Sequence, residues 1–162
     1  VNSIDARTKL RMPKTLEPWT VQKRRPQLTA VPDTQRVKDV INEVWWKIKK
    51  AHQHKNLSDD ELAIDSFCNF SQDVLRLPGG RSALGTFTTG CHIYSYEKDQ
   101  ALTGAAHLQL IGWPSTAMPA ARFGDATLRG FAGDSFSLPI ATIISTAMSL
   151  NPHLDIWDME ES

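Results

Sequence analysis

The stretch LRGFAGDSFSLPIATIISTAMSL, from Leu128 to Leu150, sets a glycine, an acid and a serine directly ahead of an apolar segment. Small residues are needed at a helix entrance wherever backbone comes close to a ligand or to another part of the chain. The apolar spacing predicts a helix over Phe136 to Leu150, in which Pro139 is tolerated only within the first turn. We expect this helix to pack five apolar side chains against the rest of the protein: Leu138, Ile140, Ile143, Ile144 and Met148.

The segment LTGAAHLQLIGWP, residues 102 to 114, predicts a second helix with a clear start and stop. Thr103 is placed as its N-cap. Gly112 followed by Pro114 ends it, so the expected range is Gly104 to Ile111. Between the two helices, Asp125 can cap the turn ATLRGFAG.

A third helix is predicted over Thr34 to Lys55, with Asp33 or Thr34 available as N-cap. Its apolar residues recur at helical spacing: Val37, Val40, Ile41, Val44, Trp45 and Ile48. Trp46 falls off that stripe beside several lysines. An exposed indole there can stack on a base, although partial burial is the commoner fate of tryptophan.

Between these helices the sequence predicts a small β element. Ser58 and Glu61 have capping-box spacing and predict a short helical turn. The segment AIDSFCNFS after it partly alternates as a strand does, and GTFTTGCHIYSY has two β-rich pieces around Gly90. Pro78, Gly79 and Gly80 predict a turn. The expected class is therefore α/β, with helices around a small β element.

Charge is balanced over the 162 residues but unevenly placed. Residues 1 to 55 hold thirteen of the eighteen Lys and Arg residues and five of the eighteen acids, so they are formally +8 and the remainder is −8. A basic segment can attract phosphate backbones. It can equally solvate a helix face or pair with the acidic remainder.

No apolar run approaches the roughly 20 residues of a membrane span, and no signal-peptide pattern is present. We therefore expect no membrane insertion and an intracellular protein, with the nucleus as one option. The chain begins with Val1 instead of Met, which fits a piece of a longer protein. No metal site is predicted.

The cysteines and histidines suggest no catalytic arrangement. Cys68 and Cys91 lack C-x-x-C spacing and a nearby histidine pair, so we expect two small buried residues. The five histidines form no pattern with Ser, Cys or Asp that suggests a triad.

Three segments in succession, GTFTTG, ALTGAAHLQLIGWP and the stretch from Leu128 to Leu150, resemble the C-terminal part of cytosine-C5 DNA methyltransferases. The resemblance covers residues 70 to 150, about half of the chain. It rests on residues that match the ninth motif of that family, namely Thr103, Leu110, Gly112, Trp113 and Pro114, and on three that match the tenth, namely Gly133, Ser135 and Pro139.

The resemblance implies part of a Rossmann-like S-adenosylmethionine-dependent methyltransferase fold. In the family, the tenth-motif helix lies beside the first strand of the sheet and helps to wall the S-adenosylmethionine pocket. Gly133, Asp134 and Ser135 would then be cofactor-binding, with the N–H groups of a helix N-terminus facing the cofactor's polar or carboxylate end. The sequence departs at Asp134, where the family usually has Asn, and at Ala106, where it often has a capping Glu.

The resemblance also implies a target-recognition region that faces DNA. Thr86, Thr88 and Thr89 could face DNA there, with Arg81 as a phosphate contact, although Thr is also a good strand former. In the basic lead-in, Lys23, Arg24 and Arg25 are further candidate DNA contacts. DNA and RNA remain open as targets.

The catalytic motifs of the family are missing from this chain. Methylation at cytosine C5 needs a cysteine from a PC loop and a glutamate from ENV, besides a glycine-rich FxGxG cofactor loop. None of the three occurs here. As given, the chain is expected to be catalytically incomplete, and a missing N-terminal segment or a partner chain would complete it.

The expected layout is a basic, proline-containing lead-in over residues 1–33, a methyltransferase-like segment over 34–152 and an acidic tail over 153–162. The middle segment divides into a target-recognition-like part, 34–100, and the ninth- and tenth-motif helices, 101–152. Two rival hypotheses stay open. One is a non-catalytic nucleic-acid-binding or scaffold module; the other is a small α/β protein whose similarity is coincidental.

Overall fold

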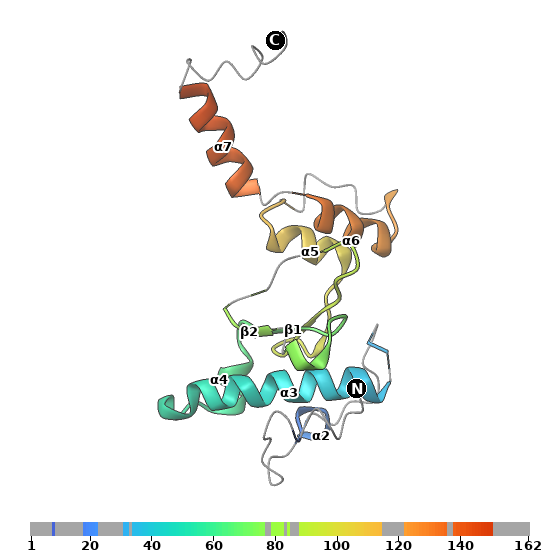
Figure 1. Ribbon diagram of the computed structural model, residues 1–162, viewed down its shortest axis with the longest axis vertical. Helices are drawn as coiled ribbons and strands as arrows, with labels where there is room; N and C mark the ends of the chain where they lie inside the picture. Colours follow the sequence, from blue (N-terminus) through green and yellow to red (C-terminus); the bar gives the residue numbers. More distant parts are fainter. Residues whose placement is uncertain are drawn as a thin grey trace.

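Helices and a small sheet alternate along the chain in the computed structural model (Figure 1). The structure describes residues 8, 18–22, 31–32, 34–76, 79–82, 84, 88–114, 122–135 and 138–150. The helices are α2 (Trp19–Gln22), α3 (Gln35–His52), α4 (Asp59–Ala63), α5 (Gly104–Leu110), α6 (Asp125–Asp134) and α7 (Leu138–Leu150), with 3₁₀ turns η1 (Gln53–Lys55) and η2 (Val74–Arg76). The strands are β1 (Ser66–Asn69), β2 (Gly79–Arg81), β3 (Ile93–Ser95) and β4 (Gln100–Ala101).

Helix α3 confirms the predicted long helix and its cap. The Oγ1 atom of Thr34 accepts a hydrogen bond from the backbone N–H of Val37 at 3.4 Å. The helix ends through η1 at Asn56, whose φ of 49° is left-handed. All six residues of the predicted apolar stripe are buried: Val37, Val40, Ile41, Val44, Trp45 and Ile48.

An aromatic cluster forms the centre of the core between α2, α3 and the sheet. Trp45 stacks between Trp19, at 4.4 Å between ring centroids, and Tyr96, at 5.1 Å. Trp19 donates its indole N–H to the hydroxyl of Tyr94 at 2.8 Å. Trp19 therefore belongs to the core although it comes from the predicted lead-in. Trp46 is also buried, with the Nζ of Lys50 5.1 Å from its ring centroid, so the exposed indole that we considered does not occur.

The four strands form one antiparallel sheet in the order β2-β1-β3-β4. The predicted α/β class with a small β element is thus confirmed. The predicted turn is wrong at Gly79 and Gly80, which lie in strand β2. A Cβ on Gly79 would lie 2.3 Å from the carbonyl oxygen of Phe67 and 2.9 Å from a methyl group of Val44. Glycine is needed there because β2 lies tightly against both β1 and α3.

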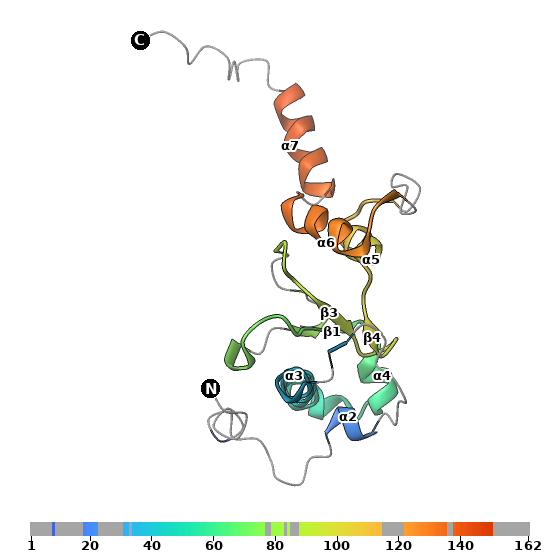
Figure 2. The ribbon, with the colours of Figure 1, turned by 90° about the vertical axis from the view of Figure 1, so that its right-hand side faces the viewer.

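Helices α5 and α6 pack on each other above the sheet and have a small core of their own (Figure 2). That core consists of Leu108, Ile111, Leu128 and Ala132. Their crossing depends on Gly104, because a Cβ there would lie 2.3 Å from the carbonyl oxygen of Asp125. Helix α5 confirms the predicted range and its Thr103 cap.

Helix α7 confirms the predicted C-terminal helix, with Pro139 in its first turn. The prediction that it packs on the rest of the protein is wrong for three of its isoleucines. Ile140, Ile143 and Ile144 are 53%, 68% and 50% exposed, and both ribbon views show α7 projecting away from the other helices (Figures 1 and 2). The side chains of Leu138 and Met148 lie outside the described part. The spacing of apolar residues predicts that a helix forms, but it does not predict whether another part of the chain packs on its apolar face.

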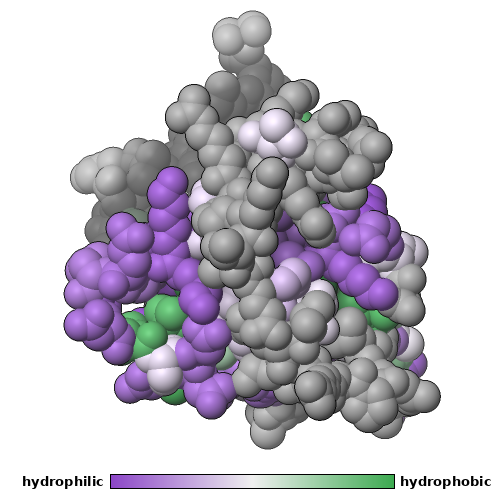
Figure 3. All heavy atoms as spheres, turned by 90° about the horizontal axis from the view of Figure 1, so that it is seen from below, coloured by the Kyte–Doolittle hydropathy of each residue, from purple (hydrophilic) through white to green (hydrophobic). Residues whose placement is uncertain are grey.

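The opposite end of the molecule presents a different surface. Seen from the α2 side, the described residues are mostly hydrophilic, with only small apolar areas between them (Figure 3). Among the described residues, the three most exposed large apolar side chains lie on α7, and Leu110, Phe123 and Phe131 in the α5–α6 region are exposed to a smaller extent.

Candidate functional site

The predicted cofactor residues Gly133, Asp134 and Ser135 lie where α6 ends. Gly133 and Asp134 are its last two residues, and Ser135 is its C-cap in extended conformation, with φ −90° and ψ 146°. Residues 136 and 137, which precede α7, lie outside the described part. The expected helix N-terminus is thus replaced, for the described residues, by a helix C-terminus, where backbone carbonyls are left free to accept hydrogen bonds.

Gly133 lies against the predicted DNA-facing threonines. A Cβ at this position would be 2.2 Å from the backbone nitrogen of Thr89 and 2.4 Å from the carbonyl carbon of Thr88. Packing of the chain on itself therefore explains this glycine. The contact brings together two predicted site segments that are far apart in the sequence. We call residues 88–90 and 133–135 together the joint strip.

The threonine part of the joint strip is accessible to solvent. Thr88, Thr89 and Gly90 are all exposed, and the carbonyl oxygen of Thr88 accepts from the backbone N–H of Cys91 at 2.9 Å, which closes the turn. Asp134 is exposed beside them. Both predicted halves of the strip can thus be reached by a ligand.

Arg81 is the one remaining predicted DNA contact within the described residues, and it does not lie at this strip. Arg81 lies at the end of the edge strand β2 and donates its Nε–H to the carbonyl oxygen of Ile64 at 3.3 Å. Strand β2 lies well below α6 in Figure 1. Thr86, Lys23, Arg24 and Arg25 lie outside the described residues.

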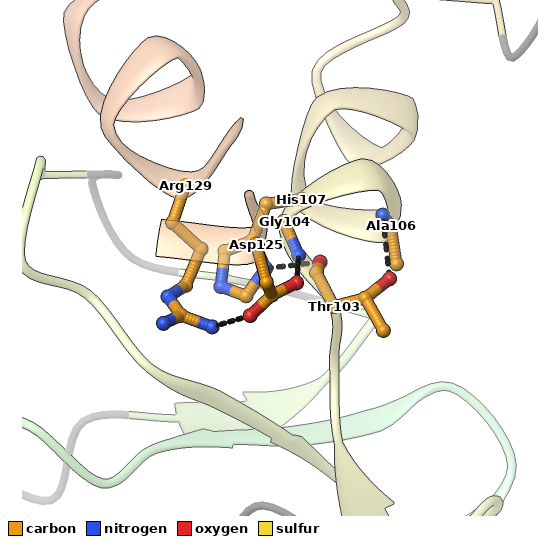
Figure 4. A network of polar contacts seen from close by, with 6 residues as sticks. All are labelled: Thr103, Gly104, Ala106, His107, Asp125 and Arg129. Carbon is orange, nitrogen blue, oxygen red and sulfur yellow. Dashed lines mark hydrogen bonds and ion pairs between the residues drawn. The ribbon is translucent and has the colours of Figure 1, made fainter. Parts of the chain in front are cut away.

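A polar network joins the first turns of α5 and α6 (Figure 4). Oδ1 of Asp125 accepts a hydrogen bond from the backbone N–H of Gly104 at 2.5 Å, and its other oxygen pairs with Arg129. Oγ1 of Thr103 accepts from the N–H of Ala106 at 3.2 Å. His107 donates from Nδ1 to the carbonyl oxygen of Thr103 at 2.8 Å, because a carbonyl can only accept.

The prediction that Asp125 caps the helix that follows it is wrong. Gly124 is the N-cap of α6, and the Asp125 side chain instead satisfies an N–H of α5. No local signal indicated this contact, because Asp125 lies 21 residues after Gly104. Nothing in the sequence indicated that Arg129 and His107 belong to this network.

Burial sets the protonation of the histidines and cysteines near this network. Burial, followed by the positive charge of Arg129, lowers the pKa of His92. Burial also lowers the pKa of the fully buried His107. Burial raises the pKa of Cys91, and it raises that of Cys68 to about 12. Neither thiol is a thiolate at neutral pH, so both cysteines are the small buried residues that we expected.

The described residues contain no group of three or more His, Cys, Asp or Glu side chains that could hold a metal ion. Within the same residues, no helix combines the length and apolar character needed to cross a membrane. No protein family model matches the chain, and no similar protein was found among curated proteins or solved structures.

Proposed function

We propose that this chain is the C-terminal portion of a DNA (cytosine-5-)-methyltransferase-like protein that acts inside the cell on DNA. In this proposal α6 and α7 contribute one wall of an S-adenosylmethionine pocket, and the turn from Thr88 to Gly90 faces DNA. The rest of the Rossmann-like fold comes from a preceding segment or a partner chain. The catalytic cysteine and glutamate belong to that missing part.

Helix α7 is the observation that carries this proposal. No charged residue occurs from Ser135 to Leu150, and Ile140, Ile143 and Ile144 point to solvent. The isoleucines and the hydroxyl residues Thr142 and Ser145 lie on different faces of α7, and an uncharged helix with an exposed apolar face normally packs that face against other protein. At 13 residues, α7 is about 20 Å long, which is shorter than the hydrocarbon core of a bilayer. A missing protein layer is therefore the cover that α7 requires.

The joint strip supports the same proposal. Gly133, one of the three residues proposed to bind the cofactor, packs against the backbone of Thr88 and Thr89, which we propose to face DNA. A methyltransferase needs these two ligands next to each other, because the methyl group passes from one to the other. The two segments are more than 40 residues apart in the sequence, so only a long-range contact brings them together.

The chemistry of the strip fits only some groups of the cofactor. Asp134 and the terminal carbonyls of α6 accept hydrogen bonds, so they suit hydroxyl or amino groups and disfavour a carboxylate. Ser135 can both donate and accept. S-adenosylmethionine, when bound, supplies the methyl group. These residues would hold one edge of it, and the missing segment would hold the rest.

The experiment compares the chain alone with the chain supplied with the preceding segment of its gene product. Alone, it should transfer no methyl group to DNA and show no S-adenosylmethionine binding by calorimetry. Binding should appear with that segment, and Asp134→Asn should weaken it, because an amide accepts a hydrogen bond from a hydroxyl or amino group less strongly than a carboxylate does. Methyl transfer by the isolated chain that Cys68→Ala or Cys91→Ala abolishes would overturn the proposal.

A matched pair of variants tests the role of α7 itself. Ile143→Lys should prevent association with the preceding segment, because it places a charge in the apolar contact. Ile64→Lys is the control, since Ile64 is also exposed, at 46%, but lies in the turn between α4 and β1. Equal effects of the two substitutions would remove the support that α7 gives.

The alternative function, a non-catalytic nucleic-acid-binding module, is favoured by the α3 half of the chain. That half has a core of its own, and it exposes Lys47 and Lys50 on one helix. Binding to DNA should then weaken steeply with salt, and replacing Lys23, Arg24 and Arg25 by Ala should flatten the salt dependence. An unchanged slope would assign these three residues to solubility or to pairing with the acidic half.

A further inference from the structure

The helix pair α5–α6 is joined to the sheet through a small core that is separate from the two larger ones. This linking core consists of Cys91, Ile93 and Leu102, with Ala106 of α5 packed against it. The main core lies below it around Trp45, and the core of the helix pair lies above it. Separate cores permit separate opening, because each cooperative unit is held by its own buried contacts.

Two histidines lie at this junction, one on each side. His107 is on α5 and is fully buried. His92 precedes β3 and packs its ring on Phe70, with 5.5 Å between ring centroids. The Nδ1–H of His107 donates to the carbonyl oxygen of Thr103. A second proton would therefore be added at Nε2, within the buried surroundings of this side chain.

The charged groups around the two histidines are Arg129 and Asp125 of α6, and they act on protonation in opposite directions. Arg129 lowers the pKa of both imidazoles, and each histidine that becomes charged would add a second cation beside it. Asp125 acts in the opposite direction, but it already accepts from Gly104 and pairs with Arg129. The Cys91 thiol is neutral, and α5 has no other ionisable side chain. A net positive junction would follow from protonation.

We propose that this junction is a proton-sensitive latch: the helix pair α5–α6 stays on the sheet only while His92 and His107 are neutral. Acidification releases the pair, together with its half of the joint strip, while α3 and the sheet stay folded. The contact between Gly133 and the Thr88–Thr89 backbone opens with it.

The direction with pH follows from burial. Both histidines have a lowered pKa in the folded protein, so the released state binds protons more readily. The free energy that holds α5–α6 on the sheet is therefore largest above the ordinary histidine pKa of 6.5, and it decreases as the pH falls below that value. Each histidine increases opening by up to about tenfold per pH unit until the pH reaches its folded pKa.

Hydrogen exchange of the full 162-residue chain between pH 7.5 and pH 5 tests the latch. Exchange rates are converted to protection factors, which removes the intrinsic effect of pH on exchange. Protection of α5 and α6 amides should fall with pH while protection of α3 amides persists. Parallel loss in α3 and in the pair, or no loss in the pair, would contradict the proposal.

Variants assign the effect to the two histidines. The double variant His92→Gln and His107→Gln keeps side-chain N–H donors but cannot titrate, so the loss of protection at low pH should disappear. His54→Gln is the matched control, because His54 is exposed in η1, and it should leave the loss unchanged. A pH profile that the double variant does not alter would exclude these histidines.

A measurement on the unmodified protein covers the case in which the double variant does not fold. NMR titration of the ring nitrogens should place both the His92 and the His107 transitions below pH 6.5. If either histidine titrates at or above 6.5, the latch does not exist.

Discussion

The α3–sheet half and the α5–α7 half of this protein differ in how their apolar side chains are covered. In the first half, Trp19, Trp45 and Tyr96 contact one another within a core of fourteen buried residues from α2, α3 and the segments around the sheet. In the second, four residues form the core of α5–α6, and α7 leaves three isoleucines half-exposed or more.

The difference indicates which half requires a partner. A half that buries its own apolar residues can fold by itself, whereas a half that exposes an uncharged helix has a surface for something else. The proposed methyltransferase assembly and the proposed latch both concern the second half. The following substitutions test the contrast, from the largest expected effect to the smallest.

Trp45→Ala should destabilise the protein most, by about 3 to 5 kcal/mol, because it removes a fully buried indole between two other aromatic rings. Chemical denaturation followed by circular dichroism measures the loss. A change below about 1 kcal/mol would mean that the aromatic cluster is not the core of the first half.

Gly104→Ala should destabilise the α5–α6 pair by about 1 to 3 kcal/mol, because the new methyl group meets backbone of α6 at 2.3 Å. Gly130→Ala is the matched control. A Cβ on Gly130 meets nothing within 4 Å, so alanine should stabilise α6 by up to about 1 kcal/mol. Hydrogen exchange of α5 and α6 amides reads both effects. The same sign for both substitutions would argue against the close crossing.

Tyr96→Phe should cost about 1 kcal/mol, because the Tyr96 hydroxyl donates a buried hydrogen bond to the carbonyl oxygen of Ile41 at 2.6 Å. The ring and its aromatic contacts remain. Denaturation midpoints at an unchanged m-value measure the difference. A neutral result would show that another donor takes over the Ile41 carbonyl.

Ile143→Ala should change the free energy of unfolding by no more than about 0.5 kcal/mol, since this side chain is 68% exposed. The same substitution at the fully buried Ile41 should cost about 2 to 5 kcal/mol. A large loss at Ile143 in the isolated chain would mean that α7 is covered in solution, for example by a second copy. A concentration series would then reveal that association.

Local signals predicted much of the fold and part of the candidate site. The helix caps at Thr34 and Thr103, the capping box of Ser58 and the start of the sheet near Ser66 all followed from neighbouring residues. Gly79 was assigned to a turn, because Pro78-Gly79-Gly80 has turn composition. Its place in strand β2 depends on contacts with Phe67 and Val44, which are too far away in the sequence to affect a local prediction.

Local residues were enough to predict the starts of α3, α4 and α5 and the apolar face of α3, because caps and periodicity act over three or four residues. They did not predict α2 or the N-cap of α6. Long-range packing brings Asp125 to the N–H of Gly104, brings Gly133 against the Thr88–Thr89 backbone and buries Trp46. It also leaves Ile140, Ile143 and Ile144 of α7 exposed. These outcomes depend on groups distant in sequence, whose approach is set by packing of whole elements and not by any local preference.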